Sequence, residues 1–344
     1  MHYRLLGNTG LYVSELCLGA MTFGAKGFWQ VMGGLQQPDV DVLVREAFNQ
    51  GVNFFDTANV YSLGESETLL GQAIKNIRLP RDEIVVATKS TGIMNETPNG
   101  RGQSRFHLFN EVDASLMRLQ LDHIDLYQLH GFDPLTPYDE LLSALNDLVK
   151  SGKIRYIGLC NMAAWQIMKA LGISRLHNWN EFVSVQAYYS IAGRDLEREI
   201  IPLVRDQKLG LMIWSPLAGG FLSGKFKRNQ TPPAGSRRAE FDFPPLNKDK
   251  AFDCIEALEP IAQSHGVSVA QAALAWILSK QQVSTIIIGA RRLEQLKDNL
   301  AASKLVLSES ELKTLDEAST LSPEYPGWML AAQGQYRAKP PVRE

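Results

Sequence analysis

Short apolar runs alternate along this chain with longer segments in which apolar residues recur at helical spacing. Eight of the short runs predict β-strands: SELCLGA (14–20), VNFFD (52–56), EIVVATK (83–89), HIDLYQLH (123–130), IRYIGLCN (154–161), EFVSVQ (181–186), GLMIWS (210–215) and STIIIGA (284–290). Each run is continuous in apolar residues rather than alternating, which is typical of strands buried on both faces of a parallel sheet.

The longer segments between and after these runs predict helices. They cover residues 38–51, 64–77, 104–120, 137–152, 163–172, 195–210, 248–266, 268–280, 292–303 and 308–318. Alternation of strand and helix indicates an α/β fold with a parallel sheet. Eight strands with at least as many helices favour closure into a (β/α)8 TIM barrel, with an open doubly wound sheet as the alternative.

Other segments fall outside this alternation. YRLLGNTGLYVSEL predicts an N-terminal β-hairpin before the barrel, which could close its bottom. The segments 21–37 and 215–247 are too long for plain connectors and follow strand ends, so we expect long loops at the C-terminal face. No linker divides the chain, so we expect one barrel domain over 1–344. Its tail, 319–344, either folds over the mouth or extends away from it.

Composition narrows the classes of function. With 35 basic and 37 acidic residues in 344, the net charge is −2, which argues against a nucleic-acid partner. Cys17, Cys160 and Cys254 are far apart and form no CxxC pair, so we expect no metal site. No run has the length of a signal sequence or of a membrane span, so we expect a cytoplasmic protein without a membrane partner. The oligomeric state stays open.

Four polar residues lie at or just after strand ends, and together they could transfer a proton. They are Asp56 and Tyr61 in NFFDTANVY, Lys89 in IVVATK and His130 in IDLYQLH. A neighbouring ammonium lowers the pKa of a phenol, so Lys89 could acidify Tyr61 while Asp56 pairs with Lys89. His130 could hydrogen-bond a substrate oxygen. Each residue alone has a structural explanation, but four at successive strand ends of a barrel indicate a catalytic site.

A carbonyl oxygen protonated there needs a hydride from elsewhere, which implies a nicotinamide cofactor. Asn161 and Gln186 end two strands and offer the amides that a carboxamide needs, and Trp214 offers a flat face for the ring. No GxGxxG follows the first strand, so a Rossmann site is disfavoured. SPLAGGFLSGKFKRNQ resembles a P-loop in spacing, but Phe226 replaces its Ser or Thr.

Two further segments could bind the phosphates of that cofactor. The glycines of SPLAGGFLSGK would let the backbone approach a pyrophosphate, and Lys225 adds a charge. After the eighth strand, Arg291 lies at the start of a predicted helix. There, free amides and an added guanidinium could bind a 2′-phosphate and so favour NADP over NAD.

Many motifs together resemble the aldo-keto reductase family. They are NFFDTANVYSLGESETLLGQAI, ATKS, DLYQLHGFD, KIRYIGLCN, VQAYYS, WSPLAGGFLSGK and IIIGARRLEQLKDNL, which lie within residues 3 to 320. The resemblance implies a (β/α)8 barrel that reduces aldehydes or ketones with NADPH. It also implies that Tyr61 is the general acid, that Lys89 and Asp56 tune it, and that His130 orients the substrate.

The resemblance also completes a set of residues expected at the cofactor. It implies that Arg237 reaches the cofactor and that Gln295, Asp298 and Asn299 face the adenosine, whereas Cys160 stands where many relatives carry serine. The expected NADP(H)-binding residues are Met21, Asp56, Cys160, Asn161, Gln186, Trp214, Ser215, Leu217, Gly219, Gly220, Lys225, Arg237, Gly289, Arg291, Gln295, Asp298 and Asn299.

The substrate is less constrained by the sequence. Candidate pocket walls are Phe23, Trp29, Met94, Phe132 and Trp328, which would suit apolar or aryl aldehydes and ketones, or the corresponding alcohols. Two other functions stay open. The barrel could be a redox-sensing regulatory subunit that binds NADPH with little turnover, although His130 favours an enzyme. It could also be a lyase in which Lys89 forms a Schiff base.

Overall fold

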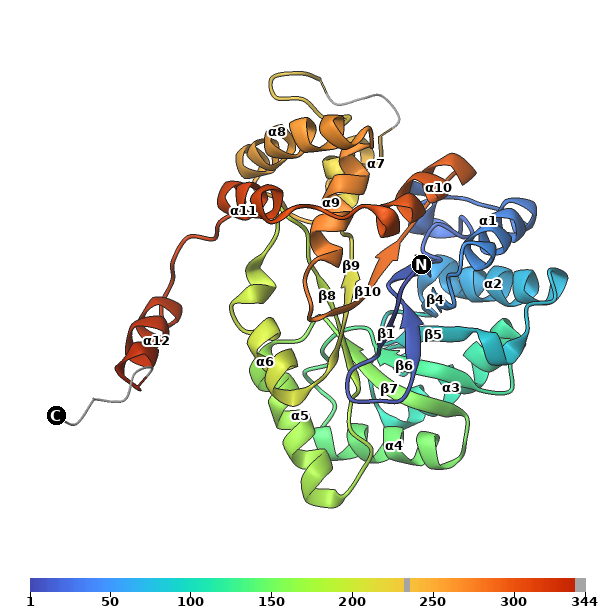
Figure 1. Ribbon diagram of the computed structural model, residues 1–344. Coiled ribbons are helices and arrows are strands. Elements are labelled where there is room, and N and C mark those ends of the chain that lie inside the picture. Colours follow the sequence, from blue (N-terminus) through green and yellow to red (C-terminus); the bar gives the residue numbers. More distant parts are fainter. Residues whose placement is uncertain (232–235, 338–344) are drawn as a thin grey trace.

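Eight parallel strands close into a barrel in a computed structural model that describes residues 1–231 and 236–337 (Figure 1). The strands pair in the order β10-β3-β4-β5-β6-β7-β8-β9. Their bounds are β3 (Leu16–Gly19), β4 (Phe54–Asp56), β5 (Val85–Ser90), β6 (Ile124–Leu129), β7 (Ile154–Cys160), β8 (Ser184–Tyr188), β9 (Gly210–Trp214) and β10 (Val283–Ile288). The predicted (β/α)8 TIM barrel is confirmed.

Helices lie outside this barrel, and all but the last of them pack around it, as the apolar spacing predicts (Figure 1). They are α1 (Gln37–Asn49), α2 (Glu65–Asn76), α3 (Arg105–Leu119), α4 (Tyr138–Lys150), α5 (Ala164–His177), α6 (Ile200–Gln207), α7 (Arg237–Glu240), α8 (Lys248–His265), α9 (Val269–Leu278), α10 (Leu293–Ala301), α11 (Glu309–Ala318) and α12 (Gly327–Gly334). In α4 the leucines form one buried face, while Asp139 and Glu140 in the first turn and Lys150 in the last complement the helix dipole.

Two predicted helices differ from the observed ones. The segment 195–210 is divided into a 3₁₀ turn, η4 (Asp195–Glu197), and α6, because Glu199 between them is not helical. Pro202 explains the break, since its ring would clash with the carbonyl of residue 198 in a continuous helix. The helix predicted to end at residue 172 continues to His177, because Gly172 is tolerated inside it.

An N-terminal hairpin closes the amino-terminal end of the barrel. Strands β1 (Tyr3–Leu5) and β2 (Tyr12–Ser14) pair antiparallel, which confirms the prediction. Leu6 from the hairpin packs into an interior cluster whose other members come mainly from the strands. These members are Val13, Cys17, Phe54, Val85, Ala87, Leu126 and Met212. The barrel is therefore filled with side chains from its bottom upward, and its polar residues lie above this apolar layer.

Gly7 brings the hairpin into contact with the barrel, and we expect Gly7→Ala to destabilise the protein. A Cβ there would lie 2.5 Å from the amide nitrogen of Gly210 and 2.5 Å from the carbonyl of Val183, and φ is +62°. Backbone clash and left-handed strain together should lower the free energy of unfolding by roughly 2 kcal/mol, measured by denaturant unfolding. Gly10→Ala is the matched control, since nothing lies within 4 Å of its Cβ. Equal stability of the two variants would contradict this account.

The C-terminal segment leaves the barrel. Helix α12 stands apart from the rest of the molecule in Figure 1, and Tyr325, Trp328 and Leu330 are exposed. The first residues of the tail are still held to the body, since Arg194 donates to Ser319 and Arg198 to the carbonyl of Ser322. Beyond them the described part extends away from the barrel up to residue 337, and residues 338–344 lie outside the described residues. Within the described ranges, no helix is both long enough and apolar enough to cross a membrane.

Candidate functional site

Asp56, Tyr61 and Lys89 lie in direct contact at the carboxyl end of the barrel strands, and the ring of His130 packs against that of Tyr61. Lys89 Nζ donates to Asp56 Oδ2 at 2.6 Å and to the carbonyl of Thr57 at 2.7 Å, and it lies 3.4 Å from Tyr61 Oη. The ring of His130 meets that of Tyr61 edge to face, with 5.6 Å between centroids. The structure therefore brings together all four residues predicted to carry the chemistry.

The loop between β4 and α2 holds Tyr61 in place. Its backbone amide at Asn59 donates to the carbonyl of Lys89 at 3.0 Å, which ties the loop to β5. Ser62 and Leu63 adopt left-handed conformations, with φ near +50°, and turn the chain within the 3₁₀ segment η2 (Tyr61–Gly64). Such conformations are costly for residues with a Cβ and persist only where the surroundings enforce them.

A partly buried ion pair supports the same region from the outer side of the strand. Glu67 on α2 accepts from Thr88 Oγ1 at 2.5 Å and from Arg118 Nε at 2.5 Å. Thr88 precedes Lys89 in β5, so this pair fixes the outer face of the strand while Lys89 points inward. Burial, partly offset by Arg118, raises the pKa of the Glu67 carboxyl.

The protonation of Tyr61 differs from the prediction. Burial raises the pKa of the Tyr61 phenol above its ordinary value, and the charge of Lys89 lowers it only in part. The prediction that Lys89 makes Tyr61 acidic overall was wrong in the net direction, because residue types alone do not give the extent of burial. Tyr61 is therefore a protonated phenol at neutral pH, with an ammonium placed to stabilise the phenolate formed when it gives up a proton.

Lys89 is held in its charged form, and His130 in its uncharged form. Burial would lower the pKa of Lys89, but the charges of Asp56 and Tyr61 outweigh it and raise that pKa above its ordinary value. Burial, and then the charge of Lys89, lower the pKa of His130 to about 3. At neutral pH the site thus contains a charged lysine and an uncharged imidazole.

Gln128 also belongs to this site, although the sequence analysis did not identify it. Its Nε2 donates to Asp56 Oδ1 at 2.9 Å, and its Oε1 accepts from Gln186 Nε2 at 3.0 Å. Gln186 also donates to Asp56 Oδ1, at 3.1 Å, so the amide expected to meet a nicotinamide is turned toward Asp56. The sequence could have identified Gln128 by strand parity, since Gln128 and His130 are two residues apart and face the same side of β6.

Two residues expected at the nicotinamide lie together at the mouth. Trp214 Nε1 donates to Asn161 Oδ1 at 2.9 Å, and Asn161 Nδ2 donates to the carbonyl of His130 at 3.1 Å. Phe243 stacks on the indole of Trp214 at 5.9 Å between centroids, with planes 6° apart. This chain of contacts links the catalytic group to a flat aromatic surface. Cys160, buried beside them, is 3.8 Å from Gln128 Oε1.

Arg237 and Arg291, two arginines near the mouth, lack a carboxylate partner among the described residues. Burial, and then the charges of Arg291 and Arg238, lower the pKa of Arg237 to about 10. Arg237 Nε is buried and has no hydrogen-bond partner in the described part of the chain. Arg238, by contrast, pairs with Asp242 at 2.5 Å. Unpaired, mutually repelling guanidinium groups favour a bound anion, so this region fits the phosphates of a dinucleotide.

Arg291 also has a contact that the sequence does not reveal. Its Nε donates to the carbonyl of Met32 at 3.1 Å, and its Nη2 donates to that of Val31. These carbonyls belong to the loop after β3, which contains the 3₁₀ turn η1 (Gly27–Val31). One guanidinium therefore ties this loop to the proposed phosphate region.

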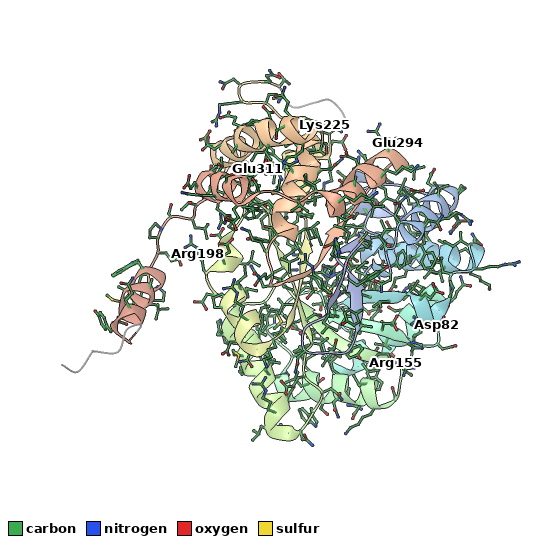
Figure 2. The ribbon with its side chains drawn as sticks, viewed as in Figure 1. Asp82, Arg155, Arg198, Lys225, Glu294 and Glu311 are labelled. Carbon is green, nitrogen blue, oxygen red and sulfur yellow. The ribbon has the colours of Figure 1, made fainter. Side chains whose placement is uncertain are left out.

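The loop after β9 carries several of the remaining expected cofactor residues. Ser215 Oγ accepts from the amide of Gly219 at 2.9 Å, and Leu217 precedes the 3₁₀ segment η5 (Ala218–Ser223). A Cβ on Gly219, whose φ is +68°, would lie 2.5 Å from the backbone carbonyl of Phe243, so only glycine allows this approach beside Arg237. Gly220 has φ near +92°, and Lys225 is exposed at the surface, where Figure 2 labels it.

Residues around α10 have partners within the protein. Gln295 accepts from the amide of Arg291 at 3.0 Å, and Asn299 donates to the carbonyl of Gly289 at 3.4 Å. Asp298 accepts from Ser268 and Gln271 at the start of α9, at 2.8 and 2.6 Å. Its carboxylate is thus occupied with a helix cap. Met21, at the start of the loop after β3, is half-buried.

Aromatic side chains surround the mouth, but two of the expected pocket walls are elsewhere. Trp29 contacts Tyr61 edge to face at 5.0 Å, and Phe28 beside it contacts Phe241 at 5.1 Å. Phe132 is exposed and Met94 is half-buried.

Phe23 and Trp328 do not wall the mouth. Phe23 is fully buried in the hydrophobic core, because its loop turns inward where Ser62 donates to its carbonyl. Trp328 lies on α12, away from the barrel (Figure 1).

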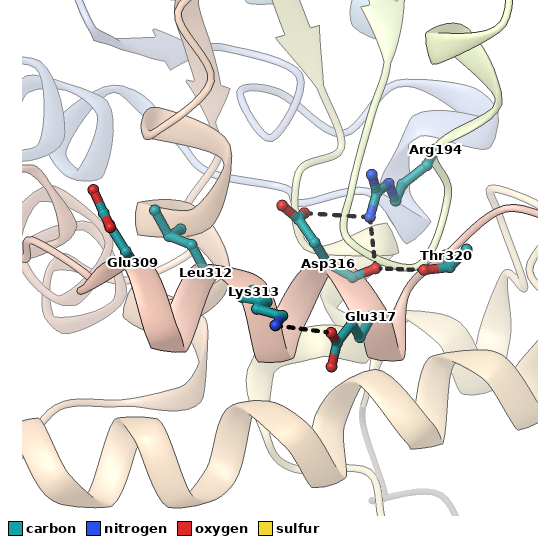
Figure 3. A pocket seen from close by; sticks show the side chains of 7 residues that line it. All are labelled: Arg194, Glu309, Leu312, Lys313, Asp316, Glu317 and Thr320. Atoms are coloured by element: carbon teal, nitrogen blue, oxygen red, sulfur yellow. Dashed lines mark hydrogen bonds and ion pairs between the residues drawn. The ribbon is translucent and has the colours of Figure 1, made fainter. Parts of the chain in front are cut away.

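A separate hollow of about 500 Å³ lies beside α11 (Figure 3). Arg194 lines it, but its guanidinium is bound to Glu197 at 2.8 Å and to Ser319 at 2.6 Å, and it pairs with Asp316. Lys313 pairs with Glu317 within the same helix. Because these charges are already paired with one another, the hollow does not compete with the mouth as a candidate site.

Comparison with known proteins finds similar sequences over most of this chain. The model of the Aldo/keto reductase family matches residues 15–320. A putative aryl-alcohol dehydrogenase of Schizosaccharomyces pombe is 36% identical over 92% of this chain and 95% of its own length. An uncharacterized oxidoreductase of Bacillus subtilis is 35% identical, with the same coverage. The versiconal hemiacetal acetate reductase of Aspergillus parasiticus is 35% identical over 95% of this chain and 99% of its own length.

Proposed function

Because this chain belongs to the aldo/keto reductase family, we propose that it reduces aldehydes or ketones to alcohols, reversibly, with NADPH as the reductant and Tyr61 as the proton donor. Family membership makes it an oxidoreductase that acts on carbonyl compounds. The role of Tyr61 as proton donor rests on the buried contacts that run from Asp56 through Lys89 to Tyr61.

Tyr61 is the group best suited to donate the proton. His130 is uncharged at neutral pH, since its pKa is about 3, and can therefore orient a carbonyl oxygen but not act as a cationic acid. Tyr61 is protonated, and Lys89 lies 3.4 Å from its oxygen to stabilise the phenolate. A reduced nicotinamide, when bound, would supply the hydride. In the reverse direction Tyr61 accepts the proton from the alcohol.

The arginines support NADP(H) as the cofactor. Arg237 and Arg291 lie near the mouth, each lacks a carboxylate partner among the described residues, and Gly219 lies beside Arg237. Trp214 and Asn161 would hold the nicotinamide end, whereas Gln186 is bonded to Asp56 and Gln128. A site with two such guanidinium groups favours the cofactor with the extra phosphate.

The aromatic mouth supports aryl or apolar carbonyl substrates. Trp29, Phe28 and Phe241 form an aromatic rim next to Tyr61. Trp29 is the one member that touches the phenol. We also propose that the protein is cytoplasmic.

Lys89 is poorly suited to Schiff-base chemistry. An amine must be uncharged to attack a carbonyl, but Asp56 keeps Lys89 charged and binds it at 2.6 Å. The lyase alternative is therefore disfavoured.

The test is a panel of aryl and alkyl aldehydes, ketones and alcohols, assayed with the purified protein by NADPH absorbance and repeated with NADH. We expect turnover of aryl aldehydes, with a higher kcat/KM for NADPH than for NADH. Tight NADPH binding without consumption of any carbonyl would instead indicate a redox-sensing subunit. Turnover with equal preference for NADH would contradict the cofactor assignment alone.

A further inference from the structure

Gln128 is a fully buried amide in the centre of the barrel, one layer below the mouth. It lies on β6, and its side chain connects Asp56 on β4 with Gln186 on β8. Cys160 on β7 approaches the same oxygen at 3.8 Å. Four strands thus contribute to one polar layer directly above the apolar interior.

The orientation of the Gln128 amide follows from its neighbours. Asp56 Oδ1 also accepts from Gln186, and Gln186 donates to Gln128 Oε1 at 3.0 Å. A flipped Gln128 would place its oxygen against the carboxylate and its NH₂ group against another NH₂ group. Gln128 therefore donates to Asp56 and accepts from Gln186.

This donation controls how Asp56 faces Lys89. One carboxylate oxygen, Oδ1, is taken by the two amides, which leaves Oδ2 directed at Lys89 Nζ at 2.6 Å. Asp56 is 2% exposed, so water cannot replace a lost donor without entering the barrel. A neutral donor stabilises the carboxylate without adding a charge that would reach Tyr61.

We propose that Gln128 is a positioning residue of the carbonyl-reducing site, which holds Asp56 oriented toward Lys89 and so sets the electrostatic field at the Tyr61 hydroxyl. This inference rests on the proposed function. Gln128 acts through Asp56 and Lys89 and does not touch the reacting oxygen.

The titratable groups around this layer are Asp56, Lys89, Tyr61, His130, Cys160 and Cys17. Burial raises the pKa of both thiols, and His130 is uncharged above about pH 3. Asp56 and Lys89 therefore supply the charges near Tyr61 at neutral pH. A further carboxylate in this layer would change the electrostatic field at the Tyr61 hydroxyl.

Two substitutions change this residue in different ways. Gln128→Met keeps a long unbranched side chain but removes the donor, so we expect kcat to fall about tenfold or more at every pH, with NADPH affinity unchanged. Gln128→Glu keeps the shape and adds an acid that must share a proton with Asp56. We expect its kcat to be close to wild type at low pH. It should then fall as the pair loses that proton, which would add an ionisation to the kcat–pH profile.

A matched control separates positioning from general stability. Ser184 is buried in the same barrel, and its hydroxyl has no hydrogen-bond partner in the described part of the chain, Asp56 included. Ser184→Ala should leave kcat and its pH profile unchanged. All variants are compared by melting temperature, so that unfolding is not mistaken for a loss of kcat.

A second readout does not need a carbonyl substrate. The Tyr61 phenolate can be titrated by ultraviolet difference spectra, with Tyr61→Phe as the reference. We expect the Tyr61 pKa to be higher in Gln128→Glu than in the wild type. If the wild type turns over no carbonyl but this shift appears, the proposed function fails and the role of Gln128 stands. A folded Gln128→Met with wild-type kcat, or a Gln128→Glu without a new ionisation or a Tyr61 shift, would overturn the inference.

Discussion

Tyr61→Phe should lower kcat by about 10²- to 10⁴-fold while leaving NADPH affinity nearly unchanged. The substitution removes one oxygen, which lies 3.4 Å from Lys89 Nζ, and keeps the ring that packs against Trp29 and His130. The substrate oxygen then has no phenol to protonate it. Stopped-flow or steady-state turnover measures kcat, and fluorescence titration measures the dissociation constant of NADPH.

Tyr127→Phe is the matched control for this variant. Tyr127 is also a fully buried tyrosine, and its hydroxyl donates to Ser90 at 2.6 Å. It packs in the outer core between barrel and helices rather than inside the barrel. Its loss should reduce stability without a comparable loss of kcat. If Tyr61→Phe and Tyr127→Phe reduced kcat equally, Tyr61 would not be the acid.

Arg291→Ala should weaken NADPH binding by roughly 10- to 100-fold and change NADH binding far less. The reason is that a charge-assisted contact to the 2′-phosphate would be lost, and NADH lacks that phosphate. The dissociation constants of both cofactors are measured without substrate. Substrate is omitted because Arg291 also holds the carbonyls of Val31 and Met32, and a looser loop could alter KM separately.

Arg292→Ala supplies the comparison at the same helix start. Arg292 is exposed, carries the same formal charge and is the next residue in the chain. It should leave the preference for NADPH intact. Equal weakening of NADPH and NADH by Arg291→Ala would show that the arginine supports the loop rather than the phosphate.

The sequence predicted the barrel and the catalytic cluster because both depend on strand ends. Asp56, Lys89 and His130 each occur at or beside the end of an apolar run, and parallel strands in a closed barrel bring such ends together. Tyr61 is five residues from Asp56, so a short loop keeps it near. These inferences needed no knowledge of loop conformation.

Properties that depend on burial or on long loops were not accessible in this way. The pKa of Tyr61 depends on how completely the barrel excludes water, and residue types do not report that. Phe23 and Trp328 lie in segments whose paths are set by tertiary contacts rather than by periodicity. Gln128 looked like an isolated polar residue in a strand, because its partner Asp56 is 72 residues away.

The hairpin lies at the bottom of the barrel, so the contacts that stabilise the fold there are far from the residues of the candidate site. Gly7, Leu6 and the apolar interior lie at one end, while the aromatic rim and both unpaired arginines lie at the other. The connections after β3 and β9 can therefore be exchanged for those of other barrels without disturbing the hairpin. We expect that grafting loops at the rim can change substrate selectivity, and that substitutions at the hairpin end can raise thermal stability.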